Sequence, residues 1–305
     1  MFRKRTPWYI LLLFSLPLSS HARLDEPGWI FTPTMGRSGP QLKALNDGLF
    51  KMPLVGQSEI TTDLPEDIEG ASSYPPKGFN ITNPLDPVPV WWEAGLEIRR
   101  NFGKKNDFVI GFGIWEVNSF SPNLDVTFPL QGEPENEALY SRRAKFSYTQ
   151  YYVGLRRYFL ERSSRFNLYI DTAIHDLFDI DYKDVHKIFF VSGAPAGFSR
   201  NIVFETQATG LLLLQFGLGA EARLADRFSI SLSGSYALGV KNATLKGITT
   251  KHDFNNGDRL LSAPTPMLVN RDGYIEYLLP DGVNRRLATF RLDGWRAQLK
   301  FNIGF

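Results

Sequence analysis

The C-terminal stretch GWRAQLKFNIGF, from Gly294 to Phe305, decides the fold. Every second position carries an apolar side chain, and these residues are Trp295, Ala297, Leu299, Phe301, Ile303 and Phe305. A period of two indicates a β-strand with one apolar face and one polar face. Because roughly 9–11 residues let a tilted strand cross a bilayer, we predict a transmembrane strand. The alternative is an edge strand of a soluble sandwich.

The rest of the chain repeats this alternation in three hairpins with tight turns. The predicted strand pairs are 90–102 with 108–120, 144–160 with 166–183, and 202–224 with 228–246. Longer polar stretches separate the hairpins, at about 121–143, 184–200 and 247–284. Short turns on one side and long loops on the other are typical of a transmembrane β-barrel with periplasmic turns and extracellular loops.

The predicted fold class is therefore all-β, an antiparallel up-and-down transmembrane β-barrel with eight strands. The C-terminal strand and the strand 90–102 run in the same direction, so an eighth strand must precede them, and we assign it to Trp29–Gly36. Residues 37–88 then form a long first extracellular loop, where seven prolines argue against further spanning strands. If the short arms Met267–Val269 and Tyr274–Leu279 extend across the membrane, the barrel has ten strands.

Two sets of side chains follow from the phase of these strands. Outward phenylalanines beside the tight turns predict an inner aromatic girdle of Phe102, Phe108, Phe159, Phe166 and Phe228, joined by Phe305. Inward positions predict an interior charge network of Glu93, Glu97, Arg99, Arg156, Asp171, His175, Glu221, Arg223, Arg296 and Lys300. Side chains fill the interior of an eight-stranded barrel, and unpaired buried charges are costly. We therefore expect a packed polar plug rather than an open pore.

The N-terminus predicts export. Residues 1–22 combine a basic Arg3-Lys4-Arg5, an apolar Tyr9–Leu18 and a small-residue site at Ala22, as in a secretory signal peptide. Residues 23–305 are expected to form a single domain. Without residues 1–22, 31 basic residues face 32 acidic ones, which gives no electrostatic case for binding nucleic acid. The absence of Cys from the sequence excludes a disulfide scaffold and a Cys-ligated zinc site.

Taken together, these features resemble the small bacterial outer-membrane β-barrel proteins of the OmpA, OmpX and OmpW type. The resemblance rests on the alternating strands and on the C-terminal strand. It implies a location in the outer membrane of a Gram-negative bacterium, among lipid and lipopolysaccharide, and a monomer. It also implies that the barrel-assembly machinery recognises a C-terminal signal made of Trp295, Leu299, Phe301, Ile303 and Phe305.

Two classes of function remain open. The leading one is a non-enzymatic barrel that has a structural or binding role or passes small solutes through a largely plugged interior, with its loops as the binding surface. It needs no catalytic residue, cofactor or metal. The alternative is a surface hydrolase, a protease or lipid-modifying enzyme, built on the acidic and His rim of the fourth strand. That rim comprises Asp176, Asp179, Asp181, Asp184 and His186, of which Asp184-Val185-His186 resembles the Asp-x-His pair of omptin proteases.

Overall fold

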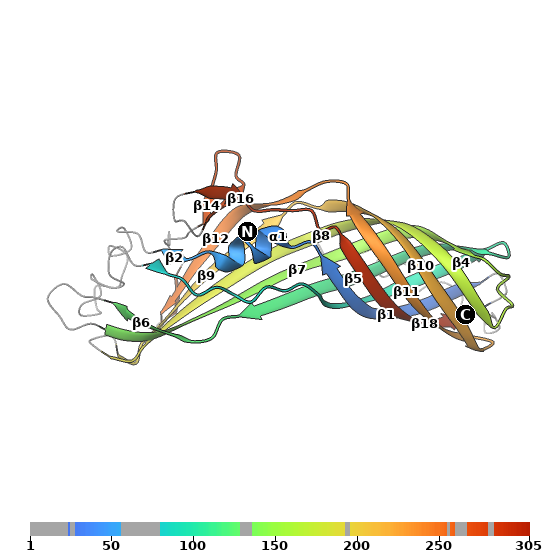
Figure 1. Cartoon of the computed structure of the whole chain (residues 1–305), viewed down its shortest axis with the longest axis horizontal. Coiled ribbons are helices and arrows are strands. Elements are labelled where there is room, and N and C mark those ends of the chain that lie inside the picture. The colour runs from blue at the N-terminus through green and yellow to red at the C-terminus, as the bar shows by residue number, and fades with distance from the viewer. Residues whose placement is uncertain are drawn as a thin grey trace.

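The computed structural model of the chain describes residues 24, 28–55, 80–128, 136–192, 196–254, 257–259, 267–279 and 284–305. The predicted signal peptide, 1–22, lies outside them. In this described part, no helix is both long enough and apolar enough to cross a membrane. The structure is an all-β antiparallel assembly (Figure 1).

Eight strands are joined into a closed ring by antiparallel pairing. They are β1 (Trp29–Pro40), β4 (Trp91–Phe102), β5 (Asn106–Phe120), β7 (Asn136–Tyr158), β8 (Phe166–Phe190), β10 (Leu211–Ala225), β11 (Phe228–Gly239) and β18 (Gly294–Gly304). The strands follow one another around the ring in that order. The ring closes where β1 pairs with β18, from Ile30 opposite Gly304 to Pro40 opposite Gly294. The short turns at 103–105, 159–165 and 226–227 all lie at one end, which we call the turn end.

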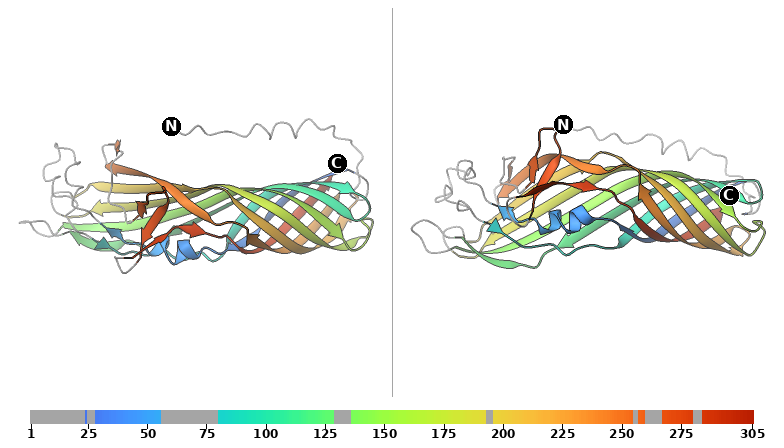
Figure 2. Two further views of the ribbon diagram at one scale, coloured as in Figure 1. Left: turned by 90° about the horizontal axis from the view of Figure 1, so that it is seen from above. Right: turned by 45° about the horizontal axis from the view of Figure 1, so that its top comes forward.

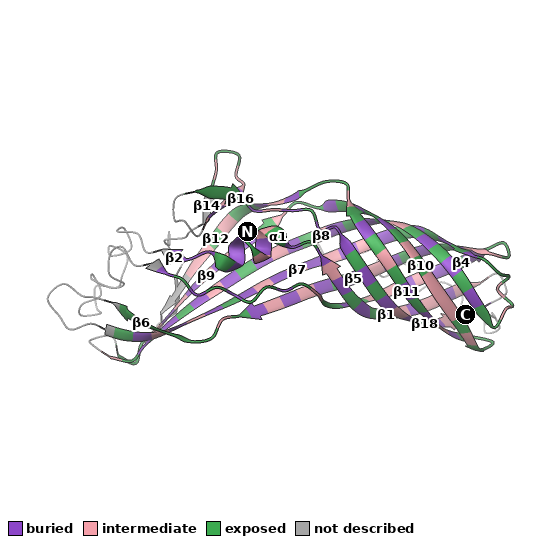
Figure 3. Cartoon of the chain, in the orientation of Figure 1, coloured by how far each residue is buried: buried purple, intermediate pink, exposed green. Residues whose placement is uncertain are grey.

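Buried and exposed residues alternate along the ring strands (Figure 3). The outward side chains are apolar and open to the surroundings: Leu218 is 67% exposed, Leu232 63% and Phe216 55%. The inward side chains include Gln298 and Lys300, which are buried. The ring is therefore polar inside and apolar outside, the reverse of a soluble protein.

Five of the eight strand positions continue beyond the ring into a second curved sheet, which we call the extension. β7 and β8 run through both parts. β6 (Leu124–Phe128), β9 (Ser199–Ala208) and β12 (Ala243–Phe254) take up the positions of β5, β10 and β11 in the extension. β13 (Gly257–Arg259) pairs with the far end of β12. Since β18, β1 and β4 have no such continuation, the extension is a trough with one open side (Figure 2).

Segments that connect the strands fill this trough. They comprise α1 (Lys43–Asn46), the 3₁₀ turn η2 (Leu49–Lys51), β2 (Leu54–Val55), β3 (Asn80–Ile81), β14 (Met267–Val269), β15 (Ile275–Leu278), β16 (Arg285–Leu287) and β17 (Thr289–Phe290). Their apolar side chains pack against those of the sheet; Phe50, Phe146 and Phe290 are almost completely buried, and the last two rings lie 5.0 Å apart. The hydrophobic core of the protein thus lies in the extension, outside the ring.

The structure corrects the four stretches that the sequence predicted to be long loops. The stretch 184–200 continues β8 to Phe190 and starts β9 at Ser199, and 121–143 contains β6 and the beginning of β7. The stretches 37–88 and 247–284 supply most of the filling segments and the end of β12. The alternation persists in these strands with its faces exchanged, since Tyr182 and Ile188 are buried while Lys187 is exposed. A prediction that looks for an apolar outer face therefore ends these strands too early, because their apolar side chains face inward in the extension.

Two strands predicted to be continuous are interrupted. The stretch 202–224 is divided into β9 and β10 by Thr209 and Gly210, opposite a bulge at Phe178 and Asp179 where Asp179 has a φ of 49°. The stretch 228–246 is divided into β11 and β12. The arms 267–269 and 274–279, on which a ten-stranded barrel would depend, belong to a separate three-stranded sheet of β14, β15 and β16.

Candidate functional site

The interior of the ring holds the densest set of charged side chains, and Glu97 of β4 lies at its centre. Its carboxylate accepts hydrogen bonds from Lys300 Nζ at 2.5 Å, Tyr152 Oη at 3.1 Å and Arg156 Nη2 at 3.3 Å. The same Arg156 nitrogen lies 3.4 Å from Asp171, and the guanidinium stacks over the Tyr169 ring at 4.2 Å. Two acids and two bases from four different strands thus form a buried cluster.

A second cluster lies toward the turn end. Arg99 Nη1 donates to Tyr158 Oη at 2.7 Å and lies 3.3 Å from Asp107 and 3.4 Å from Glu221. Glu221 also accepts hydrogen bonds from Tyr158 at 2.8 Å and from Ser229 at 2.7 Å. Arg162, from the β7–β8 turn, forms a second ion pair with Asp107.

A third cluster lies toward the extension. Glu93 accepts a hydrogen bond from Gln150 at 2.6 Å and lies 3.6 Å from Arg296. Arg296 donates to Gln150 Oε1 at 2.8 Å, and His175 Nδ1 lies 3.1 Å from the same oxygen. Across the three clusters, five carboxylates (Glu93, Glu97, Asp107, Asp171, Glu221) face five permanent cations (Arg99, Arg156, Arg162, Arg296, Lys300).

The structure brings nine of the ten predicted network residues into these clusters. Arg223, the tenth, pairs with Asp226 in its own turn. Asp107 and Arg162 were not predicted as members of the interior charge network, because both stand in or next to predicted turns. The phase of the strand identifies Asp107 in retrospect, since it directly precedes the outward Phe108 and must therefore point inward.

Large side chains help to fill the interior by lying over glycines of the neighbouring strand. A Cβ atom at Gly111 would overlap the Tyr152 ring, and one at Gly219 would overlap the Tyr169 ring. Replacing either glycine would therefore displace an aromatic ring from the middle of the network. The ring has no room for both a side chain at these positions and the tyrosine opposite.

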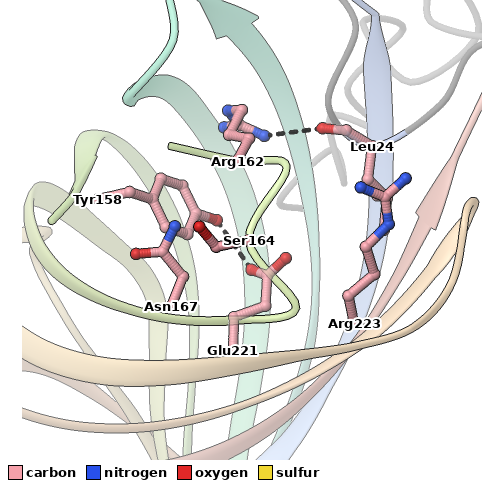
Figure 4. A pocket seen from close by; sticks show the side chains of 7 residues that line it. All are labelled: Leu24, Tyr158, Arg162, Ser164, Asn167, Glu221 and Arg223. Carbon is pink, nitrogen blue, oxygen red and sulfur yellow. Dashed lines mark hydrogen bonds between the residues drawn. The ribbon is translucent and has the colours of Figure 1, made fainter. Parts of the chain in front are cut away.

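Polar side chains from β7, β8 and β10 also gather at the turn end (Figure 4). A recess of about 10 Å³ lies there, lined by Leu24, Tyr158, Arg162, Ser164, Asn167, Glu221 and Arg223. That volume holds about one water molecule. Arg162 and Asn101 both donate to the main-chain oxygen of Leu24, at 3.2 Å each, so Leu24 is held at this end.

The acidic run proposed for a hydrolase is divided between the two faces of β8. Asp176 and Asp179 are exposed and Asp181 is half-buried on the outer face, whereas Asp184 and His186 are fully buried inside the extension. The described residues contain no group of three or more His, Asp or Glu arranged to hold a metal ion. The Asp184–His186 pair is therefore not combined with the other carboxylates of the run.

Arg142 determines what Asp184 and His186 do. Its guanidinium donates to the Asp184 carboxylate at 3.0 and 2.6 Å and to the main-chain oxygens of Leu49, Phe50 and Met52 at 2.6–3.0 Å. His186 lies on the other side of Asp184, with its Nε2 3.4 Å from Oδ1. These contacts attach the segment between β1 and β4 to β7 and β8. Arg142, Asp184 and His186 therefore have a structural role.

Burial and charge set the protonation of Asp184 and His186, which together with Arg142 we call the anchor. Burial alone would raise the pKa of Asp184, but Arg142 outweighs it and holds that pKa well below its ordinary value of 3.8. Burial lowers the pKa of His186 below its ordinary value of 6.5, although Asp184 acts in the opposite direction. The anchor is therefore an ionised carboxylate between a guanidinium and a neutral imidazole.

The predicted girdle and C-terminal residues lie on the outer face. Phe102, Phe108, Phe159, Phe166, Phe228 and Phe305 are 38–58% exposed beside the turn end. Trp295 and Phe301 are 44% and 39% exposed, and Leu299 and Ile303 are half-buried on the same face of β18.

No protein-family model matches the chain, and no curated protein matches it. Among solved structures, the crystal structure of a Pseudomonas aeruginosa FadL homologue aligns with 91% of this chain and 90% of its own, at 8% sequence identity and a TM-score of 0.20. A likeness at that score supports no inference about fold or function.

Replacing Arg156 with Ala should destabilise the ring, because Glu97 and Asp171 both lose a partner inside a confined space. Breaking a buried ion pair costs about 3–5 kcal/mol, and water entering the gap reduces this loss. Denaturant titration measures the effect. The control is Lys187→Ala, on the exposed face of β8, for which we expect a change within about 0.5 kcal/mol. Equal stability of the two variants would show that the interior charges are not coupled.

Acidification should weaken the anchor around Arg142. Both His186 and Asp184 have folded pKa values below their unfolded ones, so the unfolded chain binds more protons at low pH. Stability is therefore complete above about pH 6.5 and falls as the pH decreases, first through His186 and then, below about pH 4, through Asp184. We expect the denaturation midpoint of the wild type to decrease between about pH 7 and pH 5, and that of His186→Gln to decrease less. The same decrease in both proteins would contradict the assignment to His186.

Proposed function

We propose that this protein is an eight-stranded transmembrane β-barrel of a bacterial outer membrane, with the turn end of the ring in the periplasm and the extension outside the cell. The observation that carries the proposal is the inverted polarity of the ring. Leu218, Leu232 and Phe159 are 58–67% exposed around an interior filled with ion pairs. Soluble monomers rarely expose a continuous apolar surface larger than a few hundred Å².

The dimensions of the apolar surface support a membrane span. Phenylalanines border it at the turn end, and exposed Trp92, Tyr236 and Trp295 border it at the other. The 11 residues of β18 separate the two aromatic borders on that strand. A transmembrane strand has about 9–11 residues, and outer-membrane barrels carry aromatic girdles at both interfaces.

We propose further that the barrel is closed and acts without catalysis, with the extension as a rigid binding surface. The three charge clusters and the tyrosines that lie over Gly111 and Gly219 support closure. The burial of Asp184 and His186 under the first connecting segment supports a non-enzymatic role. The surroundings would be outer-membrane lipid and lipopolysaccharide, and Phe305 with its strand would be recognised by the barrel-assembly machinery of the cell. We expect a monomer.

Cysteine labelling tests the location and the orientation together, because the chain contains no natural Cys. In intact cells, a membrane-impermeant maleimide should label Lys187→Cys on the extension. It should label Arg165→Cys only after the outer membrane is permeabilised, and Phe216→Cys in neither case, since lipid covers that position. Recovery of the protein in the soluble periplasm would contradict the proposal. So would labelling of Phe216→Cys at the rate of Lys187→Cys.

Recordings across planar bilayers test the closed interior. Because the interior acids and bases balance and side chains fill an eight-stranded ring, we expect the wild-type protein to show no current or small, sporadic openings. Refolded protein inserted at low density is the sample, and a porin provides the positive control. Large, steady currents would show a barrel wider than eight strands.

A further inference from the structure

Two arginines interrupt the apolar outer face of the ring near its turn end. Arg100 on β4 and Arg157 on β7 are both exposed, and each stands two residues before an outward phenylalanine, Phe102 and Phe159. On the other strands, the positions next to the terminal aromatic residues are Phe31, Ile110, Leu168, Ile230 and Ile303. Within the described ring, Arg100 and Arg157 are the charged side chains of the outer face at this level.

The register places both arginines on the same side of the ring. They flank β5, where Arg100 is opposite Phe108 and Arg157 is opposite Asn106. The Arg100 guanidinium stacks over the Trp29 ring at 5.1 Å. Arg157 forms no ion pair or side-chain hydrogen bond with any residue that the structure describes.

The β4–β5 turn brings two lysines to the same place. Lys105 is fixed to the end of β7, since its main-chain oxygen accepts from Tyr158 N at 2.8 Å and its Nζ donates to the Phe159 oxygen at 2.9 Å. Lys104 is 80% exposed and lies 3.4 Å from Glu161. Outside the ring and in the turn, four cations and the Glu161 carboxylate therefore surround the end of β5, while Asp107 points inward to Arg99 and Arg162.

We propose that Arg100, Arg157 and Lys105 bind the phosphate of an anionic phospholipid, such as phosphatidylglycerol, in the periplasmic leaflet. The inference rests on the proposed function, since it requires the ring to lie in a bilayer. A guanidinium donates paired hydrogen bonds to a phosphate, and a long Arg side chain extends from an apolar surface to the headgroups. The acyl chains of the lipid then lie along Phe102, Phe108 and Leu155. A zwitterionic headgroup would add a further cation to this cationic cluster, which favours the anionic lipid.

Native mass spectrometry of the refolded full chain tests the site, with phosphatidylglycerol and phosphatidylcholine of the same acyl length as probes. We expect Arg100→Gln/Arg157→Gln to bind phosphatidylglycerol at least tenfold more weakly, with phosphatidylcholine binding unchanged. The matched control is Arg165→Gln/Arg227→Gln, which removes the same charge from two turns at the same end. Its affinity for phosphatidylglycerol should stay within twofold of wild type.

An equal loss in the control variant would assign the affinity to overall charge and overturn the site, as would unchanged binding by the Gln variant. If the Gln variant does not fold, Arg100→Lys/Arg157→Lys replaces it. This variant keeps the charge but loses the paired hydrogen bonds, and we expect at least a threefold loss of preference for phosphatidylglycerol. A full preference in the Lys variant would overturn the arginine site.

Two further measurements separate the possible failures. Inorganic phosphate at the concentration of the lipid should not compete, because it lacks acyl chains, and competition would overturn the lipid as ligand. Folding of the wild type into pure phosphatidylcholine vesicles, detected as heat-modifiable gel mobility, is recorded first. Failure to fold there would overturn the proposed barrel, whereas folding without any preference for phosphatidylglycerol would overturn the lipid site alone.

Discussion

The narrowness of the ring interior is the constraint on which the rest of the structure depends. An eight-stranded ring leaves space for side chains only, so each inward charge must find its partner on another strand. Lys300 and Glu97 are 203 residues apart in sequence yet meet at 2.5 Å. The same lack of space makes glycine necessary opposite Tyr152 and Tyr169. The charge and the size of the inward side chains therefore depend on the register of the strands that carry them.

The period of two made the ring predictable. Each ring strand has one largely apolar face, so the strands from Trp91 to Phe120 and the C-terminal strand could be placed within a few residues. Most of the interior charges followed from the same phase. Asp107 and Arg162 did not, because both fell within predicted turns. Asp107 in fact belongs to β5 and keeps its phase, whereas Arg162 lies in the β7–β8 turn, where the strand phase does not hold.

The extension could not be predicted on the same criterion. Its strands bury their apolar side chains inside the trough and present charge outside, so their pattern resembles polar loop sequence when an apolar outer face is expected. The partners of Arg142 are harder still to foresee. Three of them are main-chain oxygens in the segment from Leu49 to Met52, about 90 residues away, and main-chain groups leave no signature in a sequence.

The pairing of β1 with β18 also bears on the order of events during assembly. Thr32 and Asn302, which are 270 residues apart in sequence, meet across this seam. All other neighbouring strands in the ring are nearer in sequence, so hairpins such as β4–β5 and β10–β11 can form from local contacts. β1 can pair with β18 only when the sheet has curved into a ring. Until then, β1 and β18 are two unpaired sheet edges, which are sites of faulty association with other chains. Their pairing closes the ring and removes both edges, so the finished molecule offers no free strand edge there to other chains.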